Sequence, residues 1–388
     1  MIWSRRALLQ TAAAPILPGL APPITRVEAA PVGYPLAGSF KFFTGNERPT
    51  VMVKVTCESG AVGWGQSVPT PSWSYETAES VISTIRQHLA PVLIGGNPFD
   101  IDGAHRAMNK AMAPSFSTGM PIAKAGVDLA LHDLCGKLRG QNMPERWGRQ
   151  PLARIPLSWT VNPRDLGETE LLVQQGLDRG YRHFNVKLAP DPVYDVEMTA
   201  IVRRLAPKAF LWGDANGGYD LARAKWAAPR LANLGMNVLE QPLPSNRLSG
   251  YRELKRQGAL PILLDEGVVS AADLVEFLRL GLMDGVAMKP ARTGGLWHAR
   301  KQIEILEEAG LLVLGSGLTD PDVALAAALQ LYAAFQLTSP AALNAPQFLA
   351  GSILTLPLPV ENGEIAVPLG PGLGVEVDET KVLRGKAS

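Results

Sequence analysis

Cysteine is scarce in this sequence, because its 388 residues include two, Cys57 and Cys135, which stand far apart along the chain. Two distant thiols make neither a disulfide framework nor a zinc site, and we interpret both as buried thiols. Surplus charge is also lacking, since 37 basic residues face 36 acidic ones and no basic run stands out. This balance argues against a nucleic-acid partner and against a polybasic membrane surface.

Long hydrophobic runs are lacking too, because the apolar stretch 7–21 is short and broken by proline, so no membrane span is expected. It follows Arg5 and Arg6, and no acidic residue occurs before Glu28. Residues 1–23 therefore predict a twin-arginine export signal and a place in the periplasm or cell envelope. The alternative is a disordered tail from a start codon placed too early, which leaves the protein cytoplasmic. No clear cleavage site is visible, so where the signal is cut stays open.

The remaining composition is that of a soluble globular protein with room for two domains. Residues 24–148 read as strands followed by helices, an α+β region that contains a hairpin over 49–67. Helical spacing follows over 75–95 and 122–140, where Gly140 marks the end of the second helix. From 149 onwards, short apolar strands alternate with amphipathic helices, which is typical of a parallel α/β structure.

This second region, 149–348, has a period. A polar residue stands at the expected carboxyl end of each strand, and successive ones are 24 to 29 residues apart. Eight strands at this period, each followed by a helix, predict a (β/α)₈ barrel, in which all strand ends meet around one mouth. The eight strand-end residues are Ser158, Lys187, Asp214, Glu240, Asp265, Lys289, Ser316 and Asn344.

Three of these strand ends carry carboxylates, and they are flanked by two lysines. Asp214, Glu240 and Asp265 would repel one another at a barrel mouth unless a cation holds them, and oxygen ligands without thiols suit Mg²⁺, with Mn²⁺ as a substitute. The alternative is that each acid binds a helix N-terminus or a loop arginine. Three acids on successive strands between Lys187 and Lys289 favour the metal site.

The motifs "GDANGGYD" (213–220), "LEQPL" (239–243), "LLDEGV" (263–268) and "MKPARTGGL" (288–296) resemble the enolase superfamily, and within it the muconate lactonizing enzyme subgroup. The resemblance implies a modified TIM barrel, with 24–148 and the returning tail 349–388 as a capping domain. It also implies that Asp214, Glu240 and Asp265 bind the metal and that Lys187 and Lys289 are the acid/base pair. The residues expected next to them or against the substrate are Asn185, Asn216, Glu266, Ser316 and Asn344.

The expected chemistry is removal of the proton next to a substrate carboxylate through an enediolate, whose charge Mg²⁺ stabilises. A lysine base beside Mg²⁺ is a general pattern in this superfamily, and the cation and a neighbouring ammonium group should lower the pKa of that lysine. Two lysines on opposite faces favour a racemase or epimerase. Loss of a β-leaving group from the same enediolate would make a dehydratase or cycloisomerase, and a non-catalytic carboxylate-binding barrel is the alternative of another class.

Several positions depart from the pattern of relatives. The subgroup usually carries Lys-x-Lys on the second strand, whereas this chain has Asn185 two residues before Lys187. The seventh strand lacks the histidine of mandelate racemase-like enzymes and offers Ser316. The eighth strand ends Ala342-Leu343-Asn344, where dipeptide epimerases have Asp-x-Asp, so a dipeptide with a free amino group is a poor guess. The five histidines are interpreted as surface or structural residues.

Substrate choice is expected to lie with the capping loops 37–49 and 70–76. Phe42, Phe43, Trp73 and Tyr75 would supply apolar walls there, although each can equally serve to pack the cap on the barrel. The expected partner is a small carboxylate. A homo-oligomer is implied by the resemblance alone.

Overall fold

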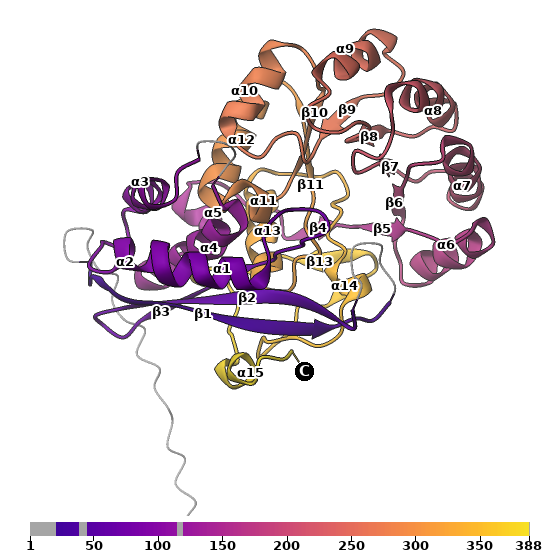
Figure 1. Cartoon of the computed structure of the whole chain (residues 1–388). Helices are drawn as coiled ribbons and strands as arrows, with labels where there is room; N and C mark the ends of the chain where they lie inside the picture. The colour runs from indigo at the N-terminus through magenta and orange to yellow at the C-terminus, as the bar shows by residue number, and fades with distance from the viewer. Residues whose placement is uncertain (1–20, 39–44, 115–118, 388) are drawn as a thin grey trace, which may run out of the picture.

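The computed structural model describes residues 21–38, 45–114 and 119–387 (Figure 1). The chain begins with a three-stranded antiparallel sheet in the order β1-β2-β3, which confirms the hairpin predicted over 49–67. Alternating buried and exposed side chains give β1 one face for the core and one for solvent. The strands of this sheet are β1 (Ile24–Pro35), β2 (Glu47–Cys57) and β3 (Val62–Ser67).

Helices cover one face of that sheet. They are α1 (Ala78–Thr84), the π-helical turn η2 (Ile85–Leu89), α2 (Ala90–Leu93), α3 (Ile101–Ala111), α4 (Pro121–Arg139) and α5 (Met143–Arg146). Helix α4 ends at Gly140 as predicted, with a positive φ of 65° that favours glycine. It packs closely on β3, because a Cβ on Gly65 would clash with the carbonyl oxygen of Gly126. Cys57 and Cys135 are both buried and free, as interpreted.

Seven parallel strands curl into the predicted barrel, and a short eighth segment closes it. The segment forms two parallel bridges, Leu157 with Ala341 at one edge of the sheet and Ser316 with Ala342 at the other. The sheet order is therefore the sequence order, as in a TIM barrel. The seven strands are β5 (Ser158–Val161), β6 (His183–Lys187), β7 (Leu211–Asp214), β8 (Val238–Glu240), β9 (Ile262–Leu264), β10 (Gly285–Met288) and β11 (Leu312–Gly315).

The first and last strands differ from their expected positions. Ser158 begins β5 instead of ending it, because Trp159 to Val161 continue the pairing with β6. The eighth strand is reduced to two bridges, since Pro340 has no N–H to donate and helix α14 (Ala345–Phe348) begins directly after Asn344. A separate three-stranded sheet includes the segment just before β5. Its strands are β12 (Val360–Glu361), β13 (Glu364–Ala366) and β4 (Arg154–Pro156).

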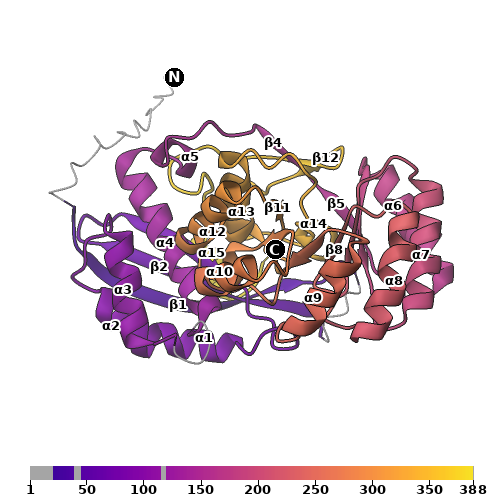
Figure 2. The ribbon, with the colours of Figure 1, turned by 90° about the horizontal axis from the view of Figure 1, so that it is seen from above.

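Helices surround the barrel strands on the outside (Figure 2). After the 3₁₀ turn η3 (Leu166–Glu168) they are α6 (Thr169–Asp178), α7 (Pro192–Leu205), α8 (Leu221–Asn233), α9 (Leu248–Gln257), α10 (Ala271–Arg279), α11 (Pro290–Thr293), α12 (Leu296–Glu308) and α13 (Asp322–Ala334). Every residue of α13 is buried, because the helix contacts β3, α4 and α5 of the N-terminal region as well as the barrel. This shared core joins the two parts of the molecule.

One buried carboxylate links the N-terminal helices to the loop after β10. Asp128 on α4 accepts a 2.6 Å hydrogen bond from the backbone N–H of Leu296 and contacts His105 Nε2 at 2.7 Å. A side chain on Gly295, which has φ 108°, would clash with Asp128, so this position needs glycine. His132 is buried and His298 is half-buried beside the same carboxylate, while His88 is exposed. Together with His105, these four histidines are thus structural or surface residues.

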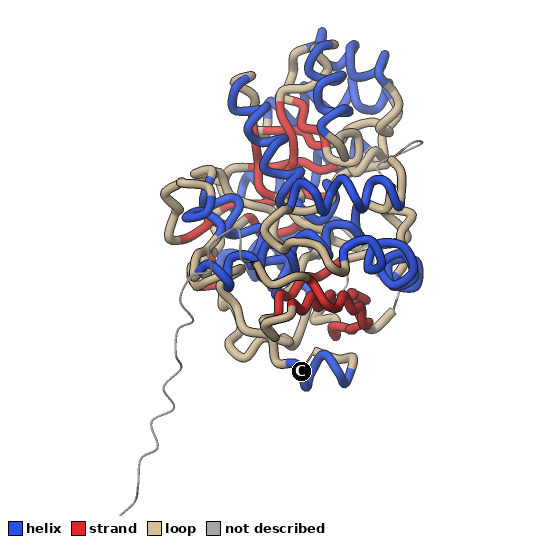
Figure 3. Tube along the Cα trace, turned by 90° about the vertical axis from the view of Figure 1, so that its left-hand side faces the viewer, coloured by secondary structure: helices blue, strands red, loops and turns tan. Residues whose placement is uncertain are grey.

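The C-terminal tail runs back to the first strand (Figures 1 and 3). Gly33 donates to the carbonyl of Gly385 at 3.0 Å and accepts from Ala387 at 3.0 Å, which places helix α15 (Glu379–Arg384) beside β1. Among the described residues, no helix combines the length and the apolar character that crossing a membrane requires. Most of the predicted export signal, residues 1–20, lies outside the described part of the chain.

Candidate active site

Strand register brings the predicted residues together at the carboxyl ends of the barrel strands. Lys187 pairs with Asp214 across β6 and β7, and Asp214 pairs with Glu240 across β7 and β8. Asp265 and Lys289 each follow their strand by one residue, after β9 and β10. The three acids and Lys289 are buried, and the side chain of Lys187 is 10% exposed. The barrel mouth therefore gathers charges that lie far apart in sequence.

Asp214 holds the first lysine. Its Oδ2 forms an ion pair with the Lys187 ammonium, and its Oδ1 accepts a 2.9 Å hydrogen bond from the backbone N–H of Asn216. Asn216 has φ 45°, a left-handed conformation that asparagine tolerates better than most residues. The turn after β7 thus fixes the carboxylate from the backbone side and turns Oδ2 toward the Lys187 ammonium.

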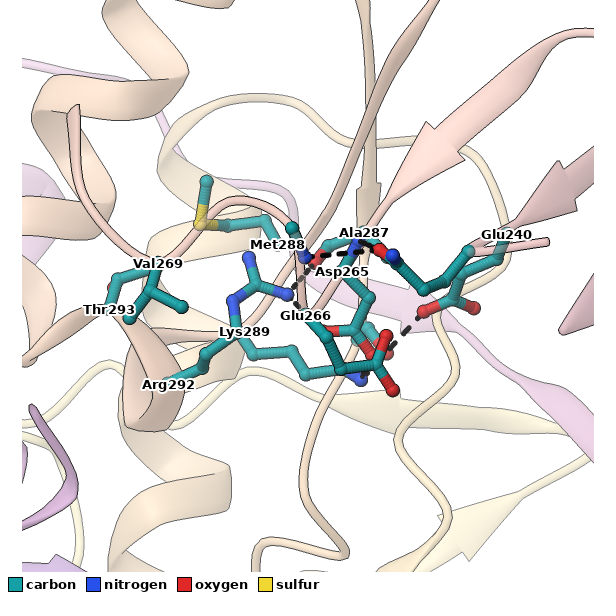
Figure 4. Close-up of polar contacts among 12 residues, drawn as sticks. Glu240, Asp265, Glu266, Val269, Ala287, Met288, Lys289, Arg292 and Thr293 are labelled. Atoms are coloured by element: carbon teal, nitrogen blue, oxygen red, sulfur yellow. Dashed lines mark hydrogen bonds and ion pairs between the residues drawn. The ribbon is translucent and has the colours of Figure 1, made fainter. Parts of the chain in front are cut away.

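Asp265 holds the second lysine together with an arginine. Its Oδ2 pairs with Lys289 and its Oδ1 with Arg292, which also donates to the carbonyl of Ala287 at 2.9 Å (Figure 4). The backbone N–H of Asp265 donates to Gln241 Oε1 at 2.9 Å. Arg292 reaches the carboxylate because the single turn α11 places it three residues after Lys289. Both oxygens of Asp265 therefore face positive charge.

Glu240 stands between these two pairs. Its Oε2 accepts a 2.7 Å hydrogen bond from Trp212 Nε1, and its Oε1 lies 3.7 Å from Lys289 Nζ without a hydrogen-bond partner among the described residues. Burial, aided by the charge of Asp214, raises the pKa of Glu240 well above its ordinary value. A carboxylate in this state needs more positive charge nearby than the protein supplies.

Glu266 lies one residue beyond Asp265 and binds the capping loop. Its Oε1 accepts hydrogen bonds from Trp73 Nε1 at 2.6 Å and from Asn216 Nδ2 at 3.2 Å. Burial and the charge of Asp265 raise the pKa of Glu266 to about 7. Burial alone would lower the pKa of Lys289, but Asp265 and Glu240 outweigh it and raise that pKa above its ordinary value. Lys289 is thus an ammonium ion in this arrangement.

The other predicted residues are only partly drawn into this group. Asn185 is buried on β6 between Thr160 and Trp212, and its Nδ2 has no hydrogen-bond partner among the described residues. Ser316 and Asn344 are buried at the ends of their segments, and the Asn344 amide reaches Thr160 Oγ1 at 3.5 Å. Of the capping-loop residues, Trp73 is half-buried, Tyr75 is 58% exposed, and Phe42 and Phe43 lie outside the described residues.

The carboxylates fit a divalent cation by their chemistry. All three are oxygen donors on adjacent strands, and Glu240 Oε1 is buried without a hydrogen-bond donor among the described residues. Lys187 and Lys289 bind two of the three. The described side chains include no group of three or more His, Cys, Asp and Glu arranged as metal ligands. A cation shared by Asp214, Glu240 and Asp265 would neutralise carboxylate charge that the two lysines neutralise here. It would thereby lower the pKa of Lys289, which is the effect expected from the sequence for a metal-bound site.

Three residues of the site were not foreseen from the sequence. Trp212 binds Glu240, Arg292 binds Asp265, and Gln241 binds the backbone of Asp265. The alternation of a strand could have found Trp212, because residues two apart share a face and Trp212 precedes Asp214 by two. Arg292 and Gln241 carry no such signal, since both lie beyond the strand ends, Arg292 on the single turn α11 and Gln241 directly after β8.

Comparisons with known proteins agree with this geometry. Two family models match the chain, "Mandelate racemase / muconate lactonizing enzyme, N-terminal domain" over 24–146 and "Enolase C-terminal domain-like" over 168–381. The chain is 33% identical over 367 residues to chloromuconate cycloisomerase of Cupriavidus necator, covering 92% of this chain and 96% of that protein. It is 29% identical over 370 residues to muconate cycloisomerase 1 of Rhodococcus opacus, with the same coverage.

Solved structures give the same picture. The 2-chloromuconate cycloisomerase of Rhodococcus opacus 1CP superposes with a TM-score of 0.85 at 28% identity, over 94% of this chain and 99% of that one. Muconate lactonizing enzyme of Pseudomonas fluorescens, solved with muconolactone, gives a TM-score of 0.87 at 25% identity with the same coverage. Both the cap and the barrel are thus shared over nearly the whole length.

Proposed function

This chain belongs to the mandelate racemase/muconate lactonizing enzyme family of the enolase superfamily, and we propose that it is a cycloisomerase acting on a small unsaturated dicarboxylate. Proteins similar to it over 92% of its length include chloromuconate and muconate cycloisomerases, so it is an enzyme and not a mere carboxylate-binding barrel. Enzymes of this subgroup generally use a divalent metal. The ion we propose is Mg²⁺, or Mn²⁺ in its place, on Asp214, Glu240 and Asp265.

The observation that carries the proposal is the pair of lysines facing a group of carboxylates. Lys187 ends the second barrel strand and Lys289 follows the sixth, so in an eight-stranded barrel they stand on opposite sides of the mouth. Asp214, Glu240 and Asp265 lie on the strands around them. A substrate carboxylate placed at this centre would have one ammonium group on each of its faces.

The reaction we propose is closure of a lactone ring. One carboxylate oxygen of a conjugated dienoate attacks a carbon of the double bond next to the other carboxylate and forms the C–O bond. The π electrons of that double bond move toward the other carboxylate, which becomes an enediolate. The Lys187 ammonium gives its proton to the α-carbon of that enediolate, so the closure consumes one proton overall. Lys289 stays protonated among Asp265 and Glu240 and stabilises the negative charge. A bound divalent cation would supply the further positive charge that the enediolate needs.

Racemisation or epimerisation is the second candidate, because two lysines on opposite faces permit removal and return of an α-proton. That function was the first expectation from the sequence, with dehydration beside it. The full-length similarity to cycloisomerases supports ring closure better than either.

The test is turnover in D₂O with Mg²⁺, using muconate, chloromuconates, N-acyl amino acids and hydroxy acids as separate substrates. We expect the dienoate absorbance of a muconate to disappear and ¹H NMR to show a lactone carrying one deuterium at the α-carbon. Lys187→Ala should lower kcat by about 10²–10⁴-fold, the usual contribution of a general acid. Chelation of the metal should abolish turnover reversibly.

Lys208→Ala is the matched control, because Lys208 is an exposed lysine on the loop before β7. It should leave kcat unchanged. Inversion with α-deuterium exchange in an N-acyl amino acid, and no lactone from any dienoate, would replace the proposal by the racemase. An olefinic or keto product from a hydroxy acid would replace it by a dehydratase.

A further inference from the structure

The loop 68–77, between β3 and α1, is anchored at both ends by buried charged side chains. Arg48, which is fully buried, donates to the carbonyls of Pro69 and, at 2.9 Å, of Val68. At the other end the buried Glu76 carboxylate accepts hydrogen bonds of 2.8 Å from the backbone N–H groups of Ile122 and Ala123 at the start of α4. Between these anchors, residues 71–75 are half-buried or exposed.

Trp73 joins the tip of this loop to the barrel. Trp73 Nε1 donates a 2.6 Å hydrogen bond to Glu266, a residue 193 positions further along the chain. The ring centroid of the same indole lies 5.1 Å from Lys289 Nζ, within the range of a cation–π contact. Asn216 donates to the same Glu266 oxygen at 3.2 Å and so helps to hold the acceptor in place.

We propose that Trp73 is a two-part positioning residue, in which the indole N–H latches loop 68–77 to Glu266 and the ring orients the Lys289 ammonium. This rests on the proposed function where it concerns catalysis, because Lys289 is there the ammonium that faces the enediolate. The latch itself rests on geometry alone. From the sequence, Trp73 is expected either to be an apolar wall or to pack the cap on the barrel, and its indole joins cap to barrel through a carboxylate and an ammonium.

The two roles of Trp73 can be tested separately, because a phenylalanine ring keeps an aromatic face but has no N–H group. Trp73→Phe keeps an aromatic face near Lys289 and removes the N–H, while Trp73→Leu removes both. A hydrogen bond to a charged acceptor is about twice as strong as a neutral one, so its loss should free the tip of the loop. Loss of the ring should in addition leave Lys289 less well oriented, and misplacement of a reacting group is costly to the chemical step.

The experiment combines kinetics with amide hydrogen exchange on the full chain. For Trp73→Phe we expect KM to rise about tenfold, as loss of one charged hydrogen bond allows, with kcat within about threefold of wild type. For Trp73→Leu we expect the same KM change and a kcat lowered by about tenfold or more. In both variants the peptide covering 68–77 should exchange faster, while barrel peptides keep their protection. Trp226→Phe, at a half-buried tryptophan on the outer helix α8, is the control and should change neither.

Each result decides a separate point. Faster exchange in 68–77 for both variants supports the latch even if no dicarboxylate is turned over, in which case the proposed function fails alone. Unchanged exchange in 68–77 overturns the latch, whatever the kinetics show. If wild type is active and Trp73→Leu keeps the kcat of Trp73→Phe, the ring does not orient Lys289 and that half of the proposal is wrong.

Discussion

The hydrogen bond from Trp212 to Glu240 allows a sharp test of the metal site. Trp212 is 0% exposed inside the barrel, and its Nε1 donates to the carboxylate at 2.7 Å. Trp212→Phe removes this donor but keeps most of the ring. A hydrogen bond to a charged group contributes about 1.5–3 kcal/mol, and a residue that supports a metal ligand typically contributes about 10–100-fold in affinity. We therefore expect Trp212→Phe to bind Mn²⁺ about 10–100-fold more weakly than wild type.

The chain offers a matched control on β5, two strands away from β7 in the same sheet. Trp159 is 2% exposed and its Nε1 has no hydrogen-bond partner among the described residues, because the ring packs outward against Tyr181 and Gly176. Trp159→Phe removes a similar buried volume without touching a carboxylate. Because no hydrogen bond to a carboxylate is lost, its Mn²⁺ affinity should stay within about twofold of wild type. A tenfold change would require a loss of about 1.4 kcal/mol of binding free energy.

The assay is a Mn²⁺ titration by calorimetry at two pH values. The pKa of Glu240 is already raised by burial, and loss of the Trp212 donor should raise it further, so protons compete with the metal over a wider range. The affinity gap between Trp212→Phe and Trp159→Phe should therefore be larger at about pH 6.5 than at about pH 8.5. Equal affinities in the two variants would refute the assignment of Glu240 as a supported metal ligand.

Two predictions concern stability. Burial raises the pKa of Glu76 from 4.5 to about 7, so the folded state binds more protons than the unfolded state between these values. The free energy of unfolding should therefore fall by up to about 3 kcal/mol as the pH rises from below 4.5 through 7. Urea unfolding from about pH 5 to about pH 8 should show a weaker pH dependence of this free energy in Glu76→Gln than in wild type, and parallel curves would contradict this. Gly65→Ala should destabilise the fold by about 1–3 kcal/mol or more, because its Cβ would clash with the backbone of Gly126, whereas Gly45→Ala, with nothing nearby, should leave the thermal midpoint unchanged.

The spacing of strand-end residues predicted the barrel because parallel strands of similar length repeat with their helices. Lys187, Asp214 and Glu240 end their strands, and Asp265 and Lys289 follow theirs by one residue. The prediction weakened at the two seams of the barrel. There the first strand continues beyond its polar residue and the last is too short for regular pairing, so a local pattern of apolar residues no longer reports the strand end.

Contacts between the cap and the barrel were beyond the reach of local patterns. Trp73 meets Glu266 across 193 positions, and Asp128 accepts from the backbone of Leu296 across 168. Neither contact produces a periodic pattern in the sequence, because the residues at a loop tip and on a buried helix face depend on the shape of the part of the fold that packs against them. Only the aromatic character of the loop was visible, and it suggested apolar packing instead of a polar latch.

The charges at the barrel mouth give the last argument for a cation at this site. Among the described residues that form this group, four carboxylates exceed three basic side chains by one, and burial raises the pKa of two of those acids, which shows how poorly these cations balance them. A divalent cation would turn the excess of one negative charge into one positive charge, which favours capture of a dianionic substrate. The groups counted are Asp214, Glu240, Asp265 and Glu266 against Lys187, Lys289 and Arg292.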